Sequence, residues 1–144
     1  MIVLAACVVT KLFVDETGST DAARLVARYP LLLAPEIIAV EVTAAVTHKA
    51  REGEIDRPTA ERALVSWWEF LALGNLHLTP DRALLPEAAK LSLTLALSPA
   101  DCLYLTLAAA HGLPLITADA SLRDAVPGAV ADVRLLTDFA LGAA

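Results

Sequence analysis

The sequence predicts an α/β fold in which a parallel sheet is covered by helices on both faces. Short runs rich in Leu, Ile and Val alternate with longer helical patterns, and this alternation is typical of βαβ units. Apolar residues make up 57% of the chain, which fits strands that are buried on both faces. The length of 144 residues fits one domain, residues 1–144, and leaves little room for a second.

The expected elements follow from the spacing of apolar residues. The strands are short apolar runs at residues 2–4, 31–33, 76–79, 113–117 and 133–136. The helices are longer stretches at residues 20–29, 35–51, 58–71, 83–97 and 98–111, and residues 8–14 form a short helical or irregular turn. The order of the strands in the sheet does not follow from this pattern.

Capping and turn-forming residues define several helix ends. Ser19 or Thr20 is suited to cap the first helix. Pro35 is expected to open the next helix, and Gly53 to end it. Pro86 is expected to delay the start of the helix that contains it, because proline disrupts a helix interior.

Charge and hydropathy argue against two classes of protein. The net charge is −6, with 17 acidic and 11 basic residues, which disfavours a protein that coats nucleic acid through bulk charge. An enzyme that grips RNA at one local basic patch, or a protein with a basic partner segment, stays open. The longest uncharged run, residues 102–118, is interrupted by His111, Gly112 and Pro114 and falls short of a membrane-spanning helix. We therefore expect no membrane contact.

The two cysteines, Cys7 and Cys102, are expected to be free thiols that pack as small residues in the reducing cytoplasm. Residues 4–7 match the small-residue box that precedes a lipidated cysteine. An export signal also needs a positive start and roughly 7–15 apolar residues before the cut, which this sequence lacks. Export is therefore not expected.

Glu41 lies within an apolar helical pattern and shares its most apolar face, because its neighbours three and four positions away are Ile and Ala. Burying a lone carboxylate costs several kcal/mol unless a cation or a donor meets it. One interpretation is a structural partner, either His48 or an Arg elsewhere. The other is a metal ligand or general base.

Asp101 and Asp119 each have a structural and a functional interpretation. Ser98-Pro99-Ala100-Asp101 resembles a capping box, and Asp119 is placed to cap a short helix after a strand. Both acids also lie where a strand and a helix meet, at the sheet edge where parallel sheets build ligand sites. Glu41 is able to point to the same edge from the start of its helix.

Carboxylates that converge on one point repel one another, and a divalent cation relieves this repulsion. Mg²⁺ or Mn²⁺ with oxygen ligands suits such a site. These ions activate water in phosphodiester cleavage. The sequence contains no Gly-rich phosphate loop, Ser–His–Asp order or HExxH motif that would favour another chemistry.

Four segments of the chain resemble VapC-type PIN domains. Residues 3–13, VLAACVVTKLF, resemble the family's opening, usually a strand ending in Asp-Ala-Ser and then an apolar stretch with Lys. Glu41 resembles the second acid of the family, and LSPADCLY at residues 97–104 resembles the block with the third. Thr117-Ala118-Asp119 resembles the block with the fourth acid and its neighbouring hydroxyl. The resemblance covers nearly the whole chain, with the blocks in the family's order.

This resemblance implies a three-layer α/β/α sandwich with a parallel sheet of about five strands. It implies an Mg²⁺- or Mn²⁺-dependent endoribonuclease toxin of a type II toxin–antitoxin system, which cuts structured RNA such as transfer or ribosomal RNA. A VapB-type antitoxin would inhibit it by placing a C-terminal segment in the acidic groove, and the toxin would be a homodimer. The implied metal ligands are Glu41, Asp101 and Asp119, with Thr117 in a weaker catalytic role.

The sequence departs from the family at residue 5, where the family has its first metal-ligating Asp and this chain has Ala5. Because alanine cannot bind a cation, we expect this protein to be inactive. A natural inactive member would have lost the site as a whole, yet the other three acids remain. We therefore favour a deliberate or selected Asp→Ala change in a ribonuclease that is toxic when made alone. Cys7 in place of Ser is a milder departure.

Several alternatives stay open at this point. One is a doubly wound receiver-like domain, although no acid follows the first strand before Asp15. Another is a non-catalytic protein that keeps the PIN shape to bind antitoxin or RNA. Three cations near the site elements are either phosphate contacts or solvated surface charge: Lys11, Lys49 and Arg51. The apolar content and the adjacent pair Trp67 and Trp68 also predict a homodimer through the early helices.

Overall fold

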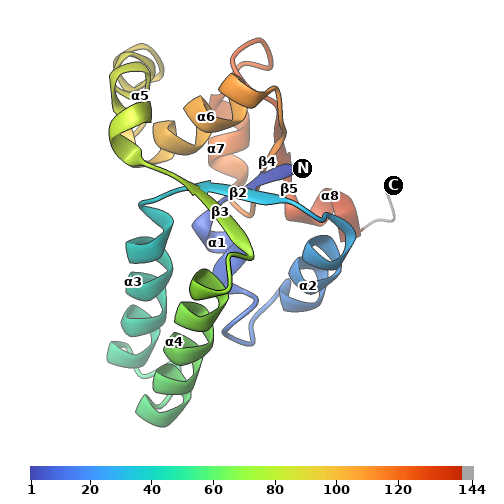
Figure 1. The fold of residues 1–144 in the computed structure, drawn as a ribbon, viewed down its shortest axis with the longest axis vertical. Helices are drawn as coiled ribbons and strands as arrows, with labels where there is room; N and C mark the ends of the chain where they lie inside the picture. Colours follow the sequence, from blue (N-terminus) through green and yellow to red (C-terminus); the bar gives the residue numbers. More distant parts are fainter. Residues whose placement is uncertain (141–144) are drawn as a thin grey trace.

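The computed structural model describes residues 1–140 and contains a five-stranded parallel sheet with helices on both faces (Figure 1). The strands are β1 (Ile2–Leu4), β2 (Leu32–Pro35), β3 (Leu76–Thr79), β4 (Leu115–Thr117) and β5 (Val133–Leu135). Their order in the sheet is β3-β2-β1-β4-β5, and every neighbouring pair is parallel. The expected α/β/α architecture is confirmed. Residues 141–144, part of the expected domain, lie outside the described residues.

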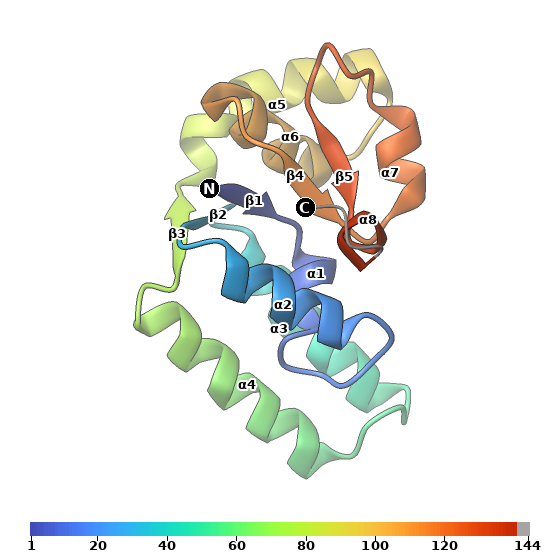
Figure 2. The same ribbon diagram turned by 90° about the vertical axis from the view of Figure 1, so that its right-hand side faces the viewer.

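The helices form two layers. They are α1 (Ala6–Thr10), α2 (Ser19–Arg28), α3 (Ile38–Arg51), α4 (Arg57–Ala72), α5 (Asp81–Leu95), α6 (Pro99–His111), α7 (Ala120–Ala125) and α8 (Leu136–Ala140). Figures 1 and 2 show α5 and α6 on one side of the sheet and α1 to α4 on the other. Within residues 1–140 no single helix is long and apolar enough to cross a membrane. Only α5 and α6 taken together would be, and the chain bends by 114° between them.

Pro35 ends a strand and does not open a helix, contrary to the sequence-based expectation. It pairs in register with Thr79 as the last residue of β2. The next backbone N–H, of Glu36, donates to the carbonyl oxygen of Thr79 at 2.9 Å. The strand therefore runs two residues past the leucine run, and α3 begins only at Ile38 after a turn.

Two other expectations about helix starts are wrong. Gly18, in the left-handed conformation with φ of 91°, precedes α2, and neither Ser19 nor Thr20 caps it. The hydroxyl of Ser19 instead accepts from the N–H of Glu16 at 3.0 Å and donates to the carbonyl of Val14 at 3.0 Å. Pro86 lies inside α5, which begins early at Asp81, so the proline removes one helical hydrogen bond without delaying the start.

A glycine cap sets the end of α6 and the start of β4. Gly112 has φ of 61°, and the N–H of Leu113 bonds back to the carbonyl of Ala108 at 3.0 Å. This capping turn includes Leu113, so β4 begins at Leu115 and is shorter than expected. Similarly, β5 ends before Leu136 because α8 begins there.

The core separates the two adjacent tryptophans as expected. Trp67 is fully buried, whereas Trp68 is 52% exposed. The ring of Trp67 meets Phe13 edge-on at 5.5 Å, and its indole N–H donates to the carbonyl of Ala39 at 3.4 Å. The bond to Ala39 joins α4 to α3, the helix that holds Glu41.

Candidate active site

The sheet topology creates a binding position between β1 and β4. The chain runs from β1 outward through β2 to β3 and then returns to the other side of β1 as β4. Open α/β sheets bind ligands outside the carboxyl ends of the strands at such a reversal. Residue 5 directly follows β1, and its N–H donates to the carbonyl of Ile116 in β4 at 3.0 Å. The segments after the two strands therefore lie side by side.

A pocket of about 310 Å³ opens at this place and contains every predicted site position. The predicted positions that line it are Ala5, Glu41, Asp101, Thr117 and Asp119. Its other lining residues are Ala6, Cys7, Thr10, Ala45, Tyr104, Leu115 and Leu122. Residues more than 110 positions apart in the chain thus share one cavity with the alanine at position 5.

Glu41 has a partner that the sequence did not reveal. The hydroxyl of Tyr104 donates to Oε1 of Glu41 at 2.6 Å. Glu41 therefore has a structural partner, as one of the two interpretations held, but this partner is Tyr104 and not His48 or an Arg. Tyr104 lies three positions after Asp101 on α6, which places the two on the same helix face, and this spacing was the only signal for it in the sequence.

Burial and neighbouring acids raise the pKa of Glu41. Burial is the largest cause, and the charges of Asp101 and Asp81 add to it, while the hydrogen bond from Tyr104 partly opposes them. Burial, and then the bond to Glu41, raises the pKa of Tyr104 well above its ordinary value. Sequence reasoning also missed Asp81, whose Oδ1 accepts from the N–H of Ile37 at 3.1 Å at the start of α3.

Ser98 caps α6 and Asp119 caps α7, as expected, and Asp101 and Asp119 also line the pocket. The N–H of Asp101 donates to Oγ of Ser98 at 3.1 Å. Oδ1 of Asp119 accepts from the N–H groups of Ser121 and Leu122 at 2.9 and 3.2 Å. The N–H of Asp119 donates to the buried Oγ1 of Thr117 at 3.1 Å. Asp119 therefore lies where β4 meets α7, as expected, whereas Asp101 lies where α5 meets α6 and not where a strand meets a helix.

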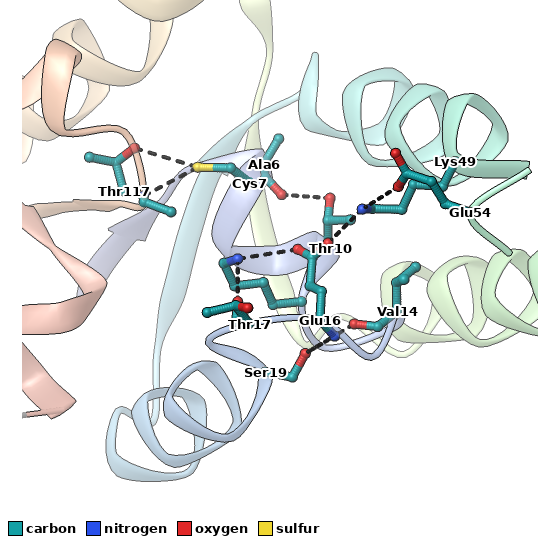
Figure 3. A network of polar contacts seen from close by, with 12 residues as sticks. Ala6, Cys7, Thr10, Val14, Glu16, Thr17, Ser19, Lys49, Glu54 and Thr117 are labelled. Carbon is teal, nitrogen blue, oxygen red and sulfur yellow. Dashed lines mark hydrogen bonds and ion pairs between the residues drawn. The ribbon is translucent and has the colours of Figure 1, made fainter. Parts of the chain in front are cut away.

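Cys7 on α1 contacts Thr117 at the end of β4 (Figure 3). Its Sγ lies 3.5 Å from Oγ1 of Thr117 and accepts from the N–H of Ala118 at 3.3 Å. Both cysteines are free thiols, as expected, and Cys102 is buried, whereas Cys7 is exposed. The thiol therefore links α1 to the turn that holds Asp119.

The residues present do not form a complete cation site. Within residues 1–140, no three His, Cys, Asp or Glu side chains lie together in an arrangement that would hold a metal ion. Position 5 contributes a methyl group, Tyr104 engages one oxygen of Glu41, and α7 engages one oxygen of Asp119. The pocket has the charge that attracts a cation, but it lacks a full set of ligands.

Lys11 and Lys49 both bind the carboxylate of Glu16. Figure 3 shows Glu16, Lys49 and Glu54 in this network of polar contacts. The Nζ atoms of Lys11 and Lys49 lie 3.2 and 2.7 Å from the two oxygens of Glu16, and Lys49 also pairs with Glu54 at 3.2 Å. Lys11 further donates to the carbonyl of Thr17 at 2.7 Å. Burial alone would raise the pKa of Glu16, but the hydrogen bonds and charges of the two lysines outweigh it and lower the pKa.

Glu16→Gln is expected to lower the free energy of unfolding by about 1 kcal/mol at neutral pH, because it removes two ion pairs from a half-buried network. A carboxylate with a lowered pKa stabilises the fold above its ordinary pKa, and that stability is lost as the pH falls through the lowered value. The difference should therefore disappear in acid. Urea unfolding of both proteins at several pH values measures it, and an equal difference at acid pH would contradict the ion-pair account.

Fold and pocket together define an α/β protein with an acidic pocket at the switch point of a parallel sheet. Residues 2–126 match the family described as PIN domain, and the chain belongs to that family. The receiver-like alternative is therefore wrong, and the strand order differs from the 2-1-3-4-5 order of such domains.

Two kinds of relatives agree with this family. The chain is 29% identical over 129 residues to Ribonuclease VapC3 from Pyrobaculum aerophilum, with 90% of this chain and 97% of the relative covered. Its fold resembles that of a toxin–antitoxin complex from Klebsiella pneumoniae (TM-score 0.65, 18% identity, 94% and 98% of the two chains covered). It also resembles VapBC2 from Rickettsia felis, solved bound to a DNA fragment from their promoter (TM-score 0.63, 14% identity, 94% and 98% covered).

Proposed function

We propose that this protein is the toxin of a type II toxin–antitoxin pair, a PIN-domain endoribonuclease of the VapC type, and that Ala5 inactivates it. The proposal covers one domain, residues 1–144. The observation that supports it best is the position of Ala5 in one pocket with Glu41, Asp101 and Asp119. A protein that had lost its catalytic function altogether would have no need to keep three acids around this alanine.

The active form would depend on Mg²⁺ or Mn²⁺, because hard divalent cations bind carboxylate oxygens and activate water in phosphodiester cleavage. An aspartate at position 5 would complete the acidic set. With Ala5 the ligand set is incomplete, so the protein as it stands has no complete site for that chemistry. Thr117 would act through Asp119, because its hydroxyl oxygen accepts a hydrogen bond from the N–H of Asp119.

Structured RNA of the transfer or ribosomal class is the proposed substrate in the cytoplasm, and a VapB-type antitoxin is the proposed inhibitor. The relatives from Klebsiella pneumoniae and Rickettsia felis are toxin–antitoxin assemblies of the same fold. A net charge of −6 and an acidic pocket favour a partner segment that is basic.

A non-catalytic PIN-shaped binding protein is the second candidate, and the incomplete ligand set favours it. RNA cleavage by the Ala5→Asp variant separates the two. Cleavage that EDTA stops supports the ribonuclease. A variant that binds RNA without cutting it supports the binding protein. Sequencing the RNA ends would then identify the bond that is cut.

We also propose a homodimer through the apolar surface of the early helices. Four large apolar side chains on or next to α3 and α4 are exposed, with exposed fractions between 51% and 79%: Val40, Val65, Trp68 and Leu73. Sedimentation at micromolar concentration should show a dimer, and Trp68→Lys should weaken it because a charge would enter an apolar contact. A clean monomer of the unchanged protein would contradict this proposal.

A further inference from the structure

The Tyr104 side chain is held in place by the protein core. Tyr104 is only 4% exposed and belongs to the main hydrophobic core. A buried side chain in a close-packed core has little rotational freedom. Its oxygen therefore occupies a fixed point in the wall of the pocket.

The bond from this hydroxyl connects two helices on opposite sides of the sheet. Tyr104 belongs to α6 and Glu41 to α3, and their oxygens lie 2.6 Å apart. A phenol is protonated at neutral pH, so it donates, and a carboxylate accepts. A bond of this length from a neutral donor to a charged acceptor belongs to the stronger class of hydrogen bonds.

The geometry leaves part of the carboxylate for a ligand. One O–H group engages one oxygen, Oε1, while a carboxylate has lone pairs on both oxygens. Glu41 itself lines the pocket together with Asp101, one turn before Tyr104 on α6. The same helix thus supplies one acid to the pocket and orients another.

We propose that Tyr104 is the positioning residue of Glu41, whose carboxylate it holds in one orientation toward the pocket. This inference rests on the proposed function to the extent that Glu41 takes part in the reaction. Groups held in the productive geometry avoid reorganisation during the reaction, and a displacement of about 1 Å can cost roughly a hundredfold in rate. Tyr104 acts through Glu41 and does not itself touch the substrate.

Tyr104→Phe tests the inference because it removes the hydroxyl and keeps the ring that fills the core. In the Ala5→Asp background we expect it to lower kcat by about tenfold to a hundredfold, with KM for RNA changed less than about twofold. Tyr29→Phe is the matched control, since Tyr29 at the end of α2 lies outside the pocket. An unchanged kcat in an active Ala5→Asp/Tyr104→Phe protein overturns the inference.

A second readout needs no activity. In the Ala5 protein, the Glu41 side chain should occupy a single rotamer by NMR, and Tyr104→Phe should spread it over several. If Ala5→Asp proves inactive, the proposed function fails, and this measurement still decides the positioning role. A Glu41 rotamer that stays single in the Phe variant overturns the inference.

Should the Phe variant fail to fold, the exchange of the Tyr104 hydroxyl proton in the Ala5 protein replaces the rotamer measurement. Protection of that proton from exchange supports the inference, and its rapid exchange overturns the inference.

Discussion

In EDTA at neutral pH, the Ala5 protein should melt at a higher temperature than its Ala5→Asp variant. An aspartate at position 5 would place a further carboxylate in a pocket that already contains Glu41, Asp101 and Asp119. Like charges at close range repel one another and disfavour the ionised form of each carboxyl group. The pKa of Glu41 is already raised by burial and by its acidic neighbours. Ala23→Asp is the matched control, because Ala23 is exposed on α2 and outside the pocket.

Millimolar Mg²⁺ or Mn²⁺ should close or reverse this gap in melting temperature. A ligand that binds only the native state stabilises it by RT ln(1 + [L]/Kd), which is about 2.7 kcal/mol at 100 times Kd. The Ala5 protein, with its incomplete ligand set, should gain much less.

Acid should narrow the gap without metal. A carboxyl whose pKa is raised in the folded state destabilises the fold when it is charged, and this penalty fades as the pH falls through the raised value. Melting scans from pH 7 toward pH 5 test this. Equal melting temperatures under all conditions would show that residue 5 does not face the acids.

Local patterns in the sequence were sufficient to predict the acids and most elements. Asp101 and Asp119 follow recognisable capping patterns, and Glu41 is conspicuous because its helical neighbours are apolar. A parallel sheet brings the carboxyl ends of its strands to one edge, so the topology alone places such residues near each other.

Contacts between distant segments could not be predicted in the same way. Tyr104 reads as one more apolar core residue on α6, and only the folded chain brings its hydroxyl to Glu41, 63 positions away. Asp81 and Cys7 are similar, since their partners Ile37 and Thr117 are remote in sequence. Pro35 was misplaced because its pairing with β3 depends on a strand order that no local pattern contains.

The largest expected effect is on RNA cleavage by the Ala5→Asp variant. It should be an Mg²⁺- or Mn²⁺-dependent ribonuclease that EDTA silences, whereas the Ala5 protein should be slower by about two orders of magnitude or more. This figure corresponds to the loss of one strong electrostatic element in a preorganised site. Asp119→Asn in the Ala5→Asp background should abolish the gain, because it neutralises an acid of the same pocket.

Ala5→Asn provides the control for shape, since it has the size of aspartate without the charge. The most direct measurement is therefore the initial rate of cleavage of one structured RNA by three proteins with Ala5, Asn and Asp at this position, in Mn²⁺ and in EDTA. We expect rapid cleavage only by the aspartate protein and only with metal. Equal rates for the Ala5 and Ala5→Asp proteins would contradict the assignment of position 5 as the missing acid.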